Sequence, residues 1–376
     1  MPRRYYLGLN AGGPSIRKML FTHGNAGDLR ELNEFLAEKY QGAPILCKNG
    51  RSALALALKA YFDPGDKIIV NGFTCYAVYE AVVAAGMTPV FIDIDPKNLN
   101  FSPEILDEFW KKLEKTHHST KQIRGIIVQN TLGNPVEIKK IQSFANEHGL
   151  TIIEDLAHSA GIKYNLKTEA GMVGAATVLS FGKDKSINTI SGGVAVLRAP
   201  QKHEIKAPTK RPRFSDVARD RFYPLFTAEC RALNHIHLGG VLMRFLITIH
   251  FVEKSADNRL SLNRRIPKFE AKLALKQLKK FHKRGEATLR DFYLVRDRAE
   301  VLKKLRSAGY YFDSFWYEKP VSPVRYYKEV KFPEKDCPNA VKVSNEIINF
   351  PKYYTEKDLK KAKEIIKPYL VGEFYG

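Results

Sequence analysis

The sequence predicts an α/β protein with a mostly parallel central sheet, helices on both faces of that sheet, and a smaller C-terminal α+β domain. Two observations predict this fold. Between residues 28 and 154, short apolar runs typical of strands alternate with segments of helical spacing, as in parallel sheets covered by helices. The chain also has 376 residues, which is long enough for two domains.

Turn residues and the spacing of apolar residues place the individual elements. Leu29, Leu32 and Leu36 recur at helical spacing, and the turn residues 64–66 (Pro-Gly-Asp) precede an apolar run. The predicted helices cover residues 28–40, 53–61, 74–85, 103–115 and 138–148. The predicted strands cover residues 67–70, 89–94, 125–129 and 151–154. In the C-terminal third, helices are expected over residues 267–282 and 356–369.

We expect a large domain over residues 1–260 and a small domain over residues 261–376, with an unusual segment over residues 201–260. Between residues 202 and 221 this segment has seven Lys/Arg against three Asp/Glu, and residues 236–252 are then mostly apolar at helical spacing. This run of 17 residues is short for a bilayer span. It predicts either a helix in the core or dimer interface, or a helix lying on an anionic membrane surface.

Composition limits the classes of partner and the compartment. The net charge of +21 attracts polyanions in general without selecting among them, and it equally fits a solubilising surface, so no specific nucleic acid is expected. The four cysteines form no CxxC pair, which argues against a disulfide framework or a cysteine zinc site and favours the cytoplasm. No apolar stretch follows the basic N-terminal residues, so we expect no signal peptide. We also expect no metal site.

Residues 151–193 carry the strongest functional signal. Asp155 closes an apolar run, and Ser180 and Lys185 lie five residues apart further along the chain. A pyridoxal phosphate site needs these groups in this order, since a carboxylate pairs with the pyridinium nitrogen, a hydroxyl holds phosphate and a lysine forms the Schiff base. Residue types alone leave Lys183 as an alternative to Lys185.

A predicted helix start could complete a phosphate site. Gly50, Arg51 and Ser52 lie where the helix over residues 53–61 begins, and free N–H groups at helix N-termini bind anions. Ser180 would add its hydroxyl to this cradle.

With these motifs in place, the chain resembles the DegT/DnrJ/EryC1/StrS family of pyridoxal-phosphate-dependent sugar aminotransferases. The resemblance extends from about residue 24 to residue 369. Residues 49–54 (NGRSAL) match the family's SGTAAL, residues 154–158 (EDLAH) match EDAAH, and residues 180–185 match SFHPxK. Weaker matches cover residues 64–70, 88–95, 191–193, 261–265 and 337–351.

The resemblance implies the aspartate aminotransferase (type I) fold and a role for each matching residue. It implies that Asp155 pairs with the pyridinium nitrogen, that His158 lies near the ring hydroxyl, and that Lys185 rather than Lys183 forms the Schiff base. Asn263 would reach the phosphate in the neighbouring subunit, which implies a homodimer.

The sequence departs from the family's pattern at several places. Arg51 replaces a small residue, residues 182–184 (GKD) replace HPx, and the segment over residues 201–261 is longer than in the family. Members usually have an aromatic residue that stacks on the cofactor, and Cys75 takes its place here. Tyr76 or Tyr79 would have to substitute, or nothing does.

The function implied is transfer of an amino group, from glutamate by family resemblance, to a keto sugar carried on a nucleotide, in amino-sugar and polysaccharide biosynthesis. Two alternatives stay open. One is a pyridoxal-phosphate-dependent sugar dehydratase of the same family, although such enzymes typically have His where Lys185 stands. The other is a non-catalytic member that acts as a membrane or protein docking module.

Overall fold

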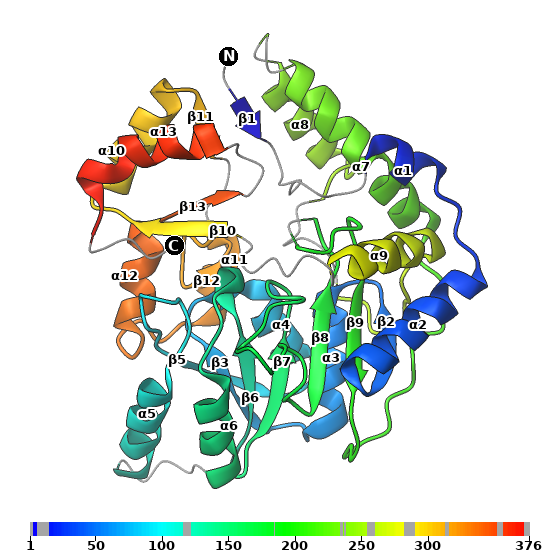
Figure 1. The fold of residues 1–376 in the computed structure, drawn as a ribbon, viewed down its shortest axis with the longest axis vertical. Coiled ribbons are helices and arrows are strands. Elements are labelled where there is room, and N and C mark those ends of the chain that lie inside the picture. Colours follow the sequence, from blue (N-terminus) through cyan, green and yellow to red (C-terminus); the bar gives the residue numbers. More distant parts are fainter. Residues whose placement is uncertain are drawn as a thin grey trace.

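A seven-stranded sheet forms the centre of the computed structural model, in the order β2-β9-β8-β7-β6-β3-β5 (Figure 1). The structure describes residues 3–5, 15–115, 122–183, 185–233, 236, 238–253, 260–281, 290–312, 316–351 and 356–371. Within this sheet β9 runs antiparallel to both of its neighbours, and the other neighbouring strands pair in parallel. The strands are β2 (Ala43–Cys47), β3 (Lys67–Asn71), β5 (Thr88–Ile92), β6 (Ile123–Gln129), β7 (Thr151–Asp155), β8 (Ala176–Ser180) and β9 (Gly193–Leu197).

Helices cover both faces of this sheet. Successive residues of a strand point to opposite faces, so Ile153 of β7 packs in the apolar cluster of α3 and α4, while Ile152 packs in that of α5 and α6. A third cluster joins α2 and α9 to β8 and β9. The covering helices are α2 (Ala26–Tyr40), α3 (Gly50–Tyr61), α4 (Tyr76–Ala84), α5 (Pro103–Lys115), α6 (Ile138–Glu147) and α9 (Lys268–Phe281).

The predicted α/β fold with its mostly parallel sheet is confirmed, although some elements begin or end elsewhere than predicted. The helix expected over residues 74–85 begins at Tyr76, because Thr74 and Cys75 form the short strand β4 (Thr74–Cys75). This strand pairs in parallel with β12 (Val321–Ser322), whose residues come from the far end of the chain. A pairing across such a sequence distance overrides the local helical pattern.

The C-terminal part has a small sheet and an apolar cluster of its own. β10 (Arg290–Leu294) pairs antiparallel with β13 (Ile347–Pro351), and α10 (Arg298–Ser307) and α13 (Glu356–Ile366) contribute to one cluster with these strands. The remaining elements of this part are β11 (Tyr310–Phe312), α11 (Val324–Val330) and α12 (Pro338–Glu346). Helix α9 packs instead on α2 of the N-terminal part. The domain boundary near residue 261 stays a prediction.

The unusual segment forms a helical hairpin at one end of the molecule. It consists of α7 (Phe214–Leu233) and α8 (Gly239–Thr248), and α7 also contacts α1 (Ile16–Phe21) (Figure 1). The helix expected over residues 236–252 is shorter in the structure, and His250, two residues beyond it, takes a positive φ of 57°. In the described part of the chain, every helix is too short or too polar to cross a bilayer.

Candidate active site

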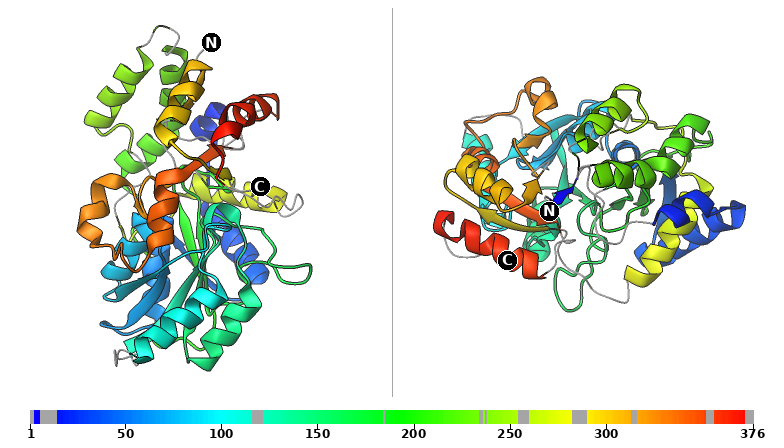
Figure 2. Two further views of the ribbon diagram at one scale, coloured as in Figure 1. Left: turned by 90° about the vertical axis from the view of Figure 1, so that its left-hand side faces the viewer. Right: turned by 90° about the horizontal axis from the view of Figure 1, so that it is seen from above.

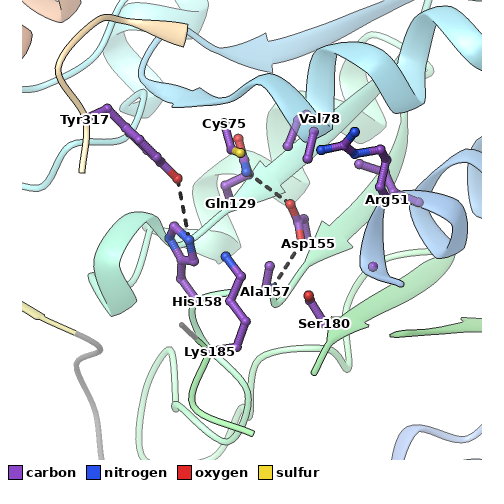
Figure 3. A pocket seen from close by; sticks show the side chains of 13 residues that line it. Arg51, Cys75, Val78, Gln129, Asp155, Ala157, His158, Ser180, Lys185 and Tyr317 are labelled. Atoms are coloured by element: carbon purple, nitrogen blue, oxygen red, sulfur yellow. Dashed lines mark hydrogen bonds between the residues drawn. The ribbon is translucent and has the colours of Figure 1, made fainter. Parts of the chain in front are cut away.

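A pocket lies at the carboxyl ends of the parallel strands, where ligands bind in sheets of this kind (Figure 3). β6 ends at Gln129, β7 at Asp155 and β8 at Ser180, and these three side chains therefore meet at one edge of the sheet. The residues that line the pocket are Gly50, Arg51, Leu54, Cys75, Ala77, Val78, Gln129, Asp155, Ala157, His158, Ser180, Lys185 and Tyr317.

Asp155 is a buried carboxylate at the bottom of this pocket. It accepts hydrogen bonds from the N–H of Ala157 at 3.0 Å and from Nε2 of Gln129 at 3.0 Å. Thr74 fixes Gln129 in turn, because its hydroxyl donates to Oε1 at 2.7 Å. Burial raises the pKa of Asp155 above its usual value, while the Ala157 N–H, the positive charge of Lys185 and the Gln129 amide act in the opposite direction. A cation bound next to Asp155 would therefore pair with a carboxylate that is shielded from water.

The two lysines that the residue pattern left as alternatives point in different directions. The half-buried Lys185 lines the pocket, with its amine directed toward His158 and Asp155 (Figure 3) and 4.7 Å from the ring centre of Trp316. Lys183 is buried elsewhere, since its amine donates to the backbone carbonyl of Glu253. Of these two amines, Lys185 alone lines the pocket.

The N-terminus of α3 meets the end of β8 at the side of the pocket. Asn49 caps this helix, accepting a hydrogen bond from the N–H of Ser52 at 2.9 Å. Gly50 lies so close to Ser180 that a Cβ at position 50 would be 2.6 Å from the Cβ of Ser180. Only glycine fits there without displacing Ser180, and the absent side chain leaves room for an anion between the helix N-terminus and the hydroxyl.

Arg51 and Ser52 make contacts beyond those expected at a phosphate site. The guanidinium of Arg51 forms an ion pair with Glu80 of α4 and is directed toward that helix (Figure 3). The fully buried hydroxyl of Ser52 accepts a hydrogen bond from the N–H of Ser261 at 2.9 Å. Arg51 still lines the pocket, whereas Ser52 connects α3 to the segment that contains Asn263.

His158 forms the opposite side of the pocket. Its Nδ1 accepts from the N–H of Leu132 at 3.2 Å, so the proton of the neutral ring is on Nε2, which lies 3.5 Å from the hydroxyl of Tyr317. Burial, followed by the positive charges of Lys185 and Arg290, lowers the pKa of His158 well below its usual value. This histidine is therefore a neutral hydrogen-bond donor at physiological pH.

Besides Ser52, two expected residues, Tyr76 and Asn263, do not line the pocket. Tyr76 stacks on Tyr326 at 4.4 Å between ring centres, and its hydroxyl donates to Glu329 at 3.2 Å. Cys75 and Val78 line the pocket beside it, with Ala77 between them in the same wall. Asn263 is exposed, and its backbone carbonyl accepts from the N–H of Lys210 at 3.0 Å.

Other residues around the pocket were not expected from the sequence. Gln129 could have been found, because it ends a predicted strand as Asp155 does. Trp316, which stacks on His158 at 4.8 Å, and Tyr317 come from an aromatic segment far along the chain that carries no local signal.

The pocket fits pyridoxal phosphate on two observations. Asp155 is a desolvated carboxylate that a pyridinium N–H would complement, and the Gly50–Ser180 contact leaves an anion cradle at a helix N-terminus. The side chain of Lys185 lines the same pocket.

Comparison with known proteins identifies the chain. The model of the DegT/DnrJ/EryC1/StrS aminotransferase family matches residues 21–367. The chain belongs to this family. Its enzyme class is therefore a pyridoxal-phosphate-dependent aminotransferase, and the resemblance, the fold and the cofactor expected from the sequence are confirmed.

Relatives of this aminotransferase differ in how much of the chain they match. It is 24% identical over 335 residues to the pleiotropic regulatory protein of Geobacillus stearothermophilus, across 88% of this chain and 84% of that protein. It is 31% identical over 166 residues to the UDP-2-acetamido-2-deoxy-3-oxo-D-glucuronate aminotransferase of Pseudomonas aeruginosa, across 44% of this chain and 43% of that enzyme. The alignment thus spans less than half of that enzyme's length.

A solved structure shows the same fold. The aminotransferase of this family from Brucella abortus superposes with a TM-score of 0.65 at 21% identity, and the match covers 92% of this chain and 91% of that one.

Proposed function

We propose that this aminotransferase transfers an amino group, with glutamate as the donor, to a keto sugar carried on a nucleotide. The observation that carries the proposal is the buried carboxylate of Asp155 facing the same pocket as the amine of Lys185. The relative from Pseudomonas aeruginosa, whose name gives a UDP-linked 3-oxo sugar as substrate, supports the choice of acceptor. The net charge of +21 suits a diphosphate substrate.

The residues that would hold the cofactor follow from the pocket. Ser180 and the N-terminus of α3 at Gly50 would bind the phosphate, with Arg51 and Ser52 beside them. Asp155 would bind the pyridinium N–H, and His158 would donate from Nε2 to the ring hydroxyl. Lys185 would bond to the aldehyde carbon. When bound, the cofactor supplies an electron sink for the bond that breaks at the donor's α-carbon.

Lys185 would also move the proton. When it is not bonded to the cofactor, its amine would take a proton from the donor's α-carbon and deliver it to the carbon that was the cofactor's aldehyde carbon. The ring of Trp316, 4.7 Å from Nζ, limits where the amine can lie, and Asp155 would keep the ring nitrogen protonated. Cys75, Ala77 and Val78 also line the pocket.

The acceptor can be tested by a screen of keto sugar nucleotides. After glutamate has converted the cofactor, a true acceptor is expected to restore its original absorbance and to yield an amino sugar with the nucleotide attached. Keto sugars without the nucleotide are the control. Product that has lost a hydroxyl group and gained no amine would favour the dehydratase instead, and a failure of glutamate to change the absorbance would refute the proposed donor.

We also propose a cytoplasmic homodimer. Asn263 supports the dimer, because it matches a family residue that reaches the neighbouring subunit and it is exposed outside its own pocket. The cysteines Cys47, Cys75, Cys230 and Cys337 are free, which supports a reducing compartment.

The dimer predicts that two inactive variants complement each other. A Lys185→Ala chain supplies Asn263 to its partner, and an Asn263→Ala chain supplies Lys185, so a mixed dimer contains one intact site. We expect activity to appear after the two purified variants are mixed and exchanged, whereas each alone stays inactive or weak. A fully active monomer by light scattering would refute the shared site.

A further inference from the structure

The α7–α8 hairpin exposes an apolar stripe that the core does not use. Along α8, Val241 is 54% exposed, Phe245 57% and Ile249 43%, and Leu238 at the start of the helix is 51% exposed. These residues are spaced three and four apart, so they lie on one face. Met243, on the inner side of the helix, is buried.

The inner face already has its partner. Met243 and Leu246 pack in a cluster with Tyr223 and Cys230 of α7. The hairpin is therefore held by one face of α8, and the outer stripe adds nothing to its packing. Exposed apolar patches of this kind mark interaction sites.

The stripe is placed where a flat surface could reach it. Helix α8 lies at the end of the molecule opposite α5 and α6, and in the other views it also projects beyond the sheet (Figure 1, Figure 2). Its ten residues are about 15 Å long, against about 30 Å for the hydrocarbon core of a bilayer. Such a helix can lie in the interface of a membrane and cannot span it.

Exposed basic residues lie on α8 and in the segment that leads into α7. Arg244 is exposed on α8 itself, and Lys206, Lys210, Arg211 and Arg213 are exposed in the segment that leads into α7. Among the residues that the structure describes, no carboxylate forms an ion pair with any of these five.

Three carboxylates in this part of the chain are paired within the protein. Asp216 and Glu253 pair with Arg219, and Asp220 pairs with Lys48. Glu204 and Glu229 are exposed, so the five exposed cations outnumber the exposed acids of this part.

We propose that the α7–α8 hairpin docks the enzyme on an anionic lipid surface. Val241, Phe245 and Ile249 would enter the boundary between headgroups and acyl chains, while Arg244 and the basic segment 206–213 would bind the headgroups. This proposal does not rest on the function assigned to the pocket.

Charge favours lipid over a second copy of the chain. Two copies joined through this face of α8 would bring their exposed Arg244 side chains toward each other, and like charges repel. An anionic surface instead pairs with every exposed cation, and its acyl region accepts the aliphatic stripe.

The test is co-sedimentation of the full chain with vesicles at low salt. Wild type is expected to bind anionic vesicles made of an equal mixture of phosphatidylcholine and phosphatidylserine, and to dissociate from them as salt is added. It is expected to bind vesicles of phosphatidylcholine alone only weakly. The double variant Phe245→Asp/Ile249→Asp should bind the anionic vesicles about tenfold or more weakly, because it loses apolar burial and gains negative charge. Arg244→Glu should weaken binding to the anionic vesicles and leave the weak binding to phosphatidylcholine vesicles unchanged.

A matched control separates docking from the added charge. Leu166 and Val324 are also exposed, and they lie outside the hairpin, so Leu166→Asp/Val324→Asp adds the same charge without touching the stripe. This control should bind vesicles nearly as wild type does. Both double variants should keep the bound cofactor's absorbance, which checks the fold.

Three outcomes would overturn the proposal. The first is that wild type does not bind anionic vesicles at low salt. The second is that the control variant loses binding as the stripe variant does. The third is that the stripe variant has a different oligomeric state from wild type in light scattering. The last would assign the stripe to a second copy of the chain.

Discussion

Replacing Lys185 with Ala is expected to abolish transamination and to remove the visible absorbance that arises when the cofactor is bonded to the enzyme. The pocket contains this lysine amine beside Asp155 and His158, and the variant has no group that could replace it there. Loss of proton transfer alone lowers the rate by about 10²–10⁴-fold, and loss of the covalent bond adds to this. Absorbance spectra of the purified protein, with and without borohydride, measure the bond directly.

Lys183→Met is the matched control for this prediction. Methionine keeps most of the aliphatic stem beside Tyr223, whose ring centre lies 4.3 Å from the amine of Lys183. This variant should be less stable, because it loses the hydrogen bond to the carbonyl of Glu253, and should keep its absorbance. If Lys183→Met loses the absorbance and Lys185→Ala keeps it, the assignment is reversed.

Asp155→Asn is expected to keep the fold and to lower turnover by about 10–10³-fold. A carboxylate in contact with the ring nitrogen would raise the pKa of that nitrogen by about 1–3 units. Each unit changes its ratio of protonated to unprotonated form by a factor of ten. Asparagine keeps the shape of the side chain and one acceptor, so packing changes little. Steady-state kinetics and the pH dependence of the cofactor's absorbance measure the effect.

Glu154→Gln provides the comparison for Asp155. Glu154 is fully buried on the opposite side of the strand, and its carboxylate accepts from the backbone N–H groups of Gly171, Val173 and Gly174. We expect this change to lower the free energy of unfolding and to leave the pH dependence of the absorbance unchanged. Turnover close to wild type in Asp155→Asn would contradict the role of Asp155.

The sequence could predict the residues whose position depends on strand ends. Asp155 and Ser180 each close a strand of a parallel sheet, and the carboxyl ends of such strands meet at one edge. Gly50 could be predicted for a similar reason, since it opens a helix that follows a strand. Spacing and motif were sufficient here because the contacts depend on regular geometry.

Other parts of the site depend on contacts between distant segments, which no local pattern records. Residue types could not separate Lys183 from Lys185, and the contact that turns Lys183 away joins it to a carbonyl 70 residues further on. Tyr76 was a reasonable candidate for the stacking position, but its ring is held by Tyr326 in the C-terminal part of the chain. Tyr317 reaches His158 across 159 residues.

The hydrogen bond between Lys183 and Glu253 connects the end of the hairpin to the loop that contains Lys185. Glu253 follows α8, and Lys183 is only two residues from Lys185, so the end of the hairpin limits where the pocket's amine can lie. A constraint of this kind acts in both directions, because coupling free energies between two sites are reciprocal. Binding that orders the end of the hairpin at Glu253 would therefore also restrict the loop, and a cofactor bonded to Lys185 would restrict the end of the hairpin in turn. Position in the sequence hides this connection, because none of the described residues between 214 and 253 lines the pocket.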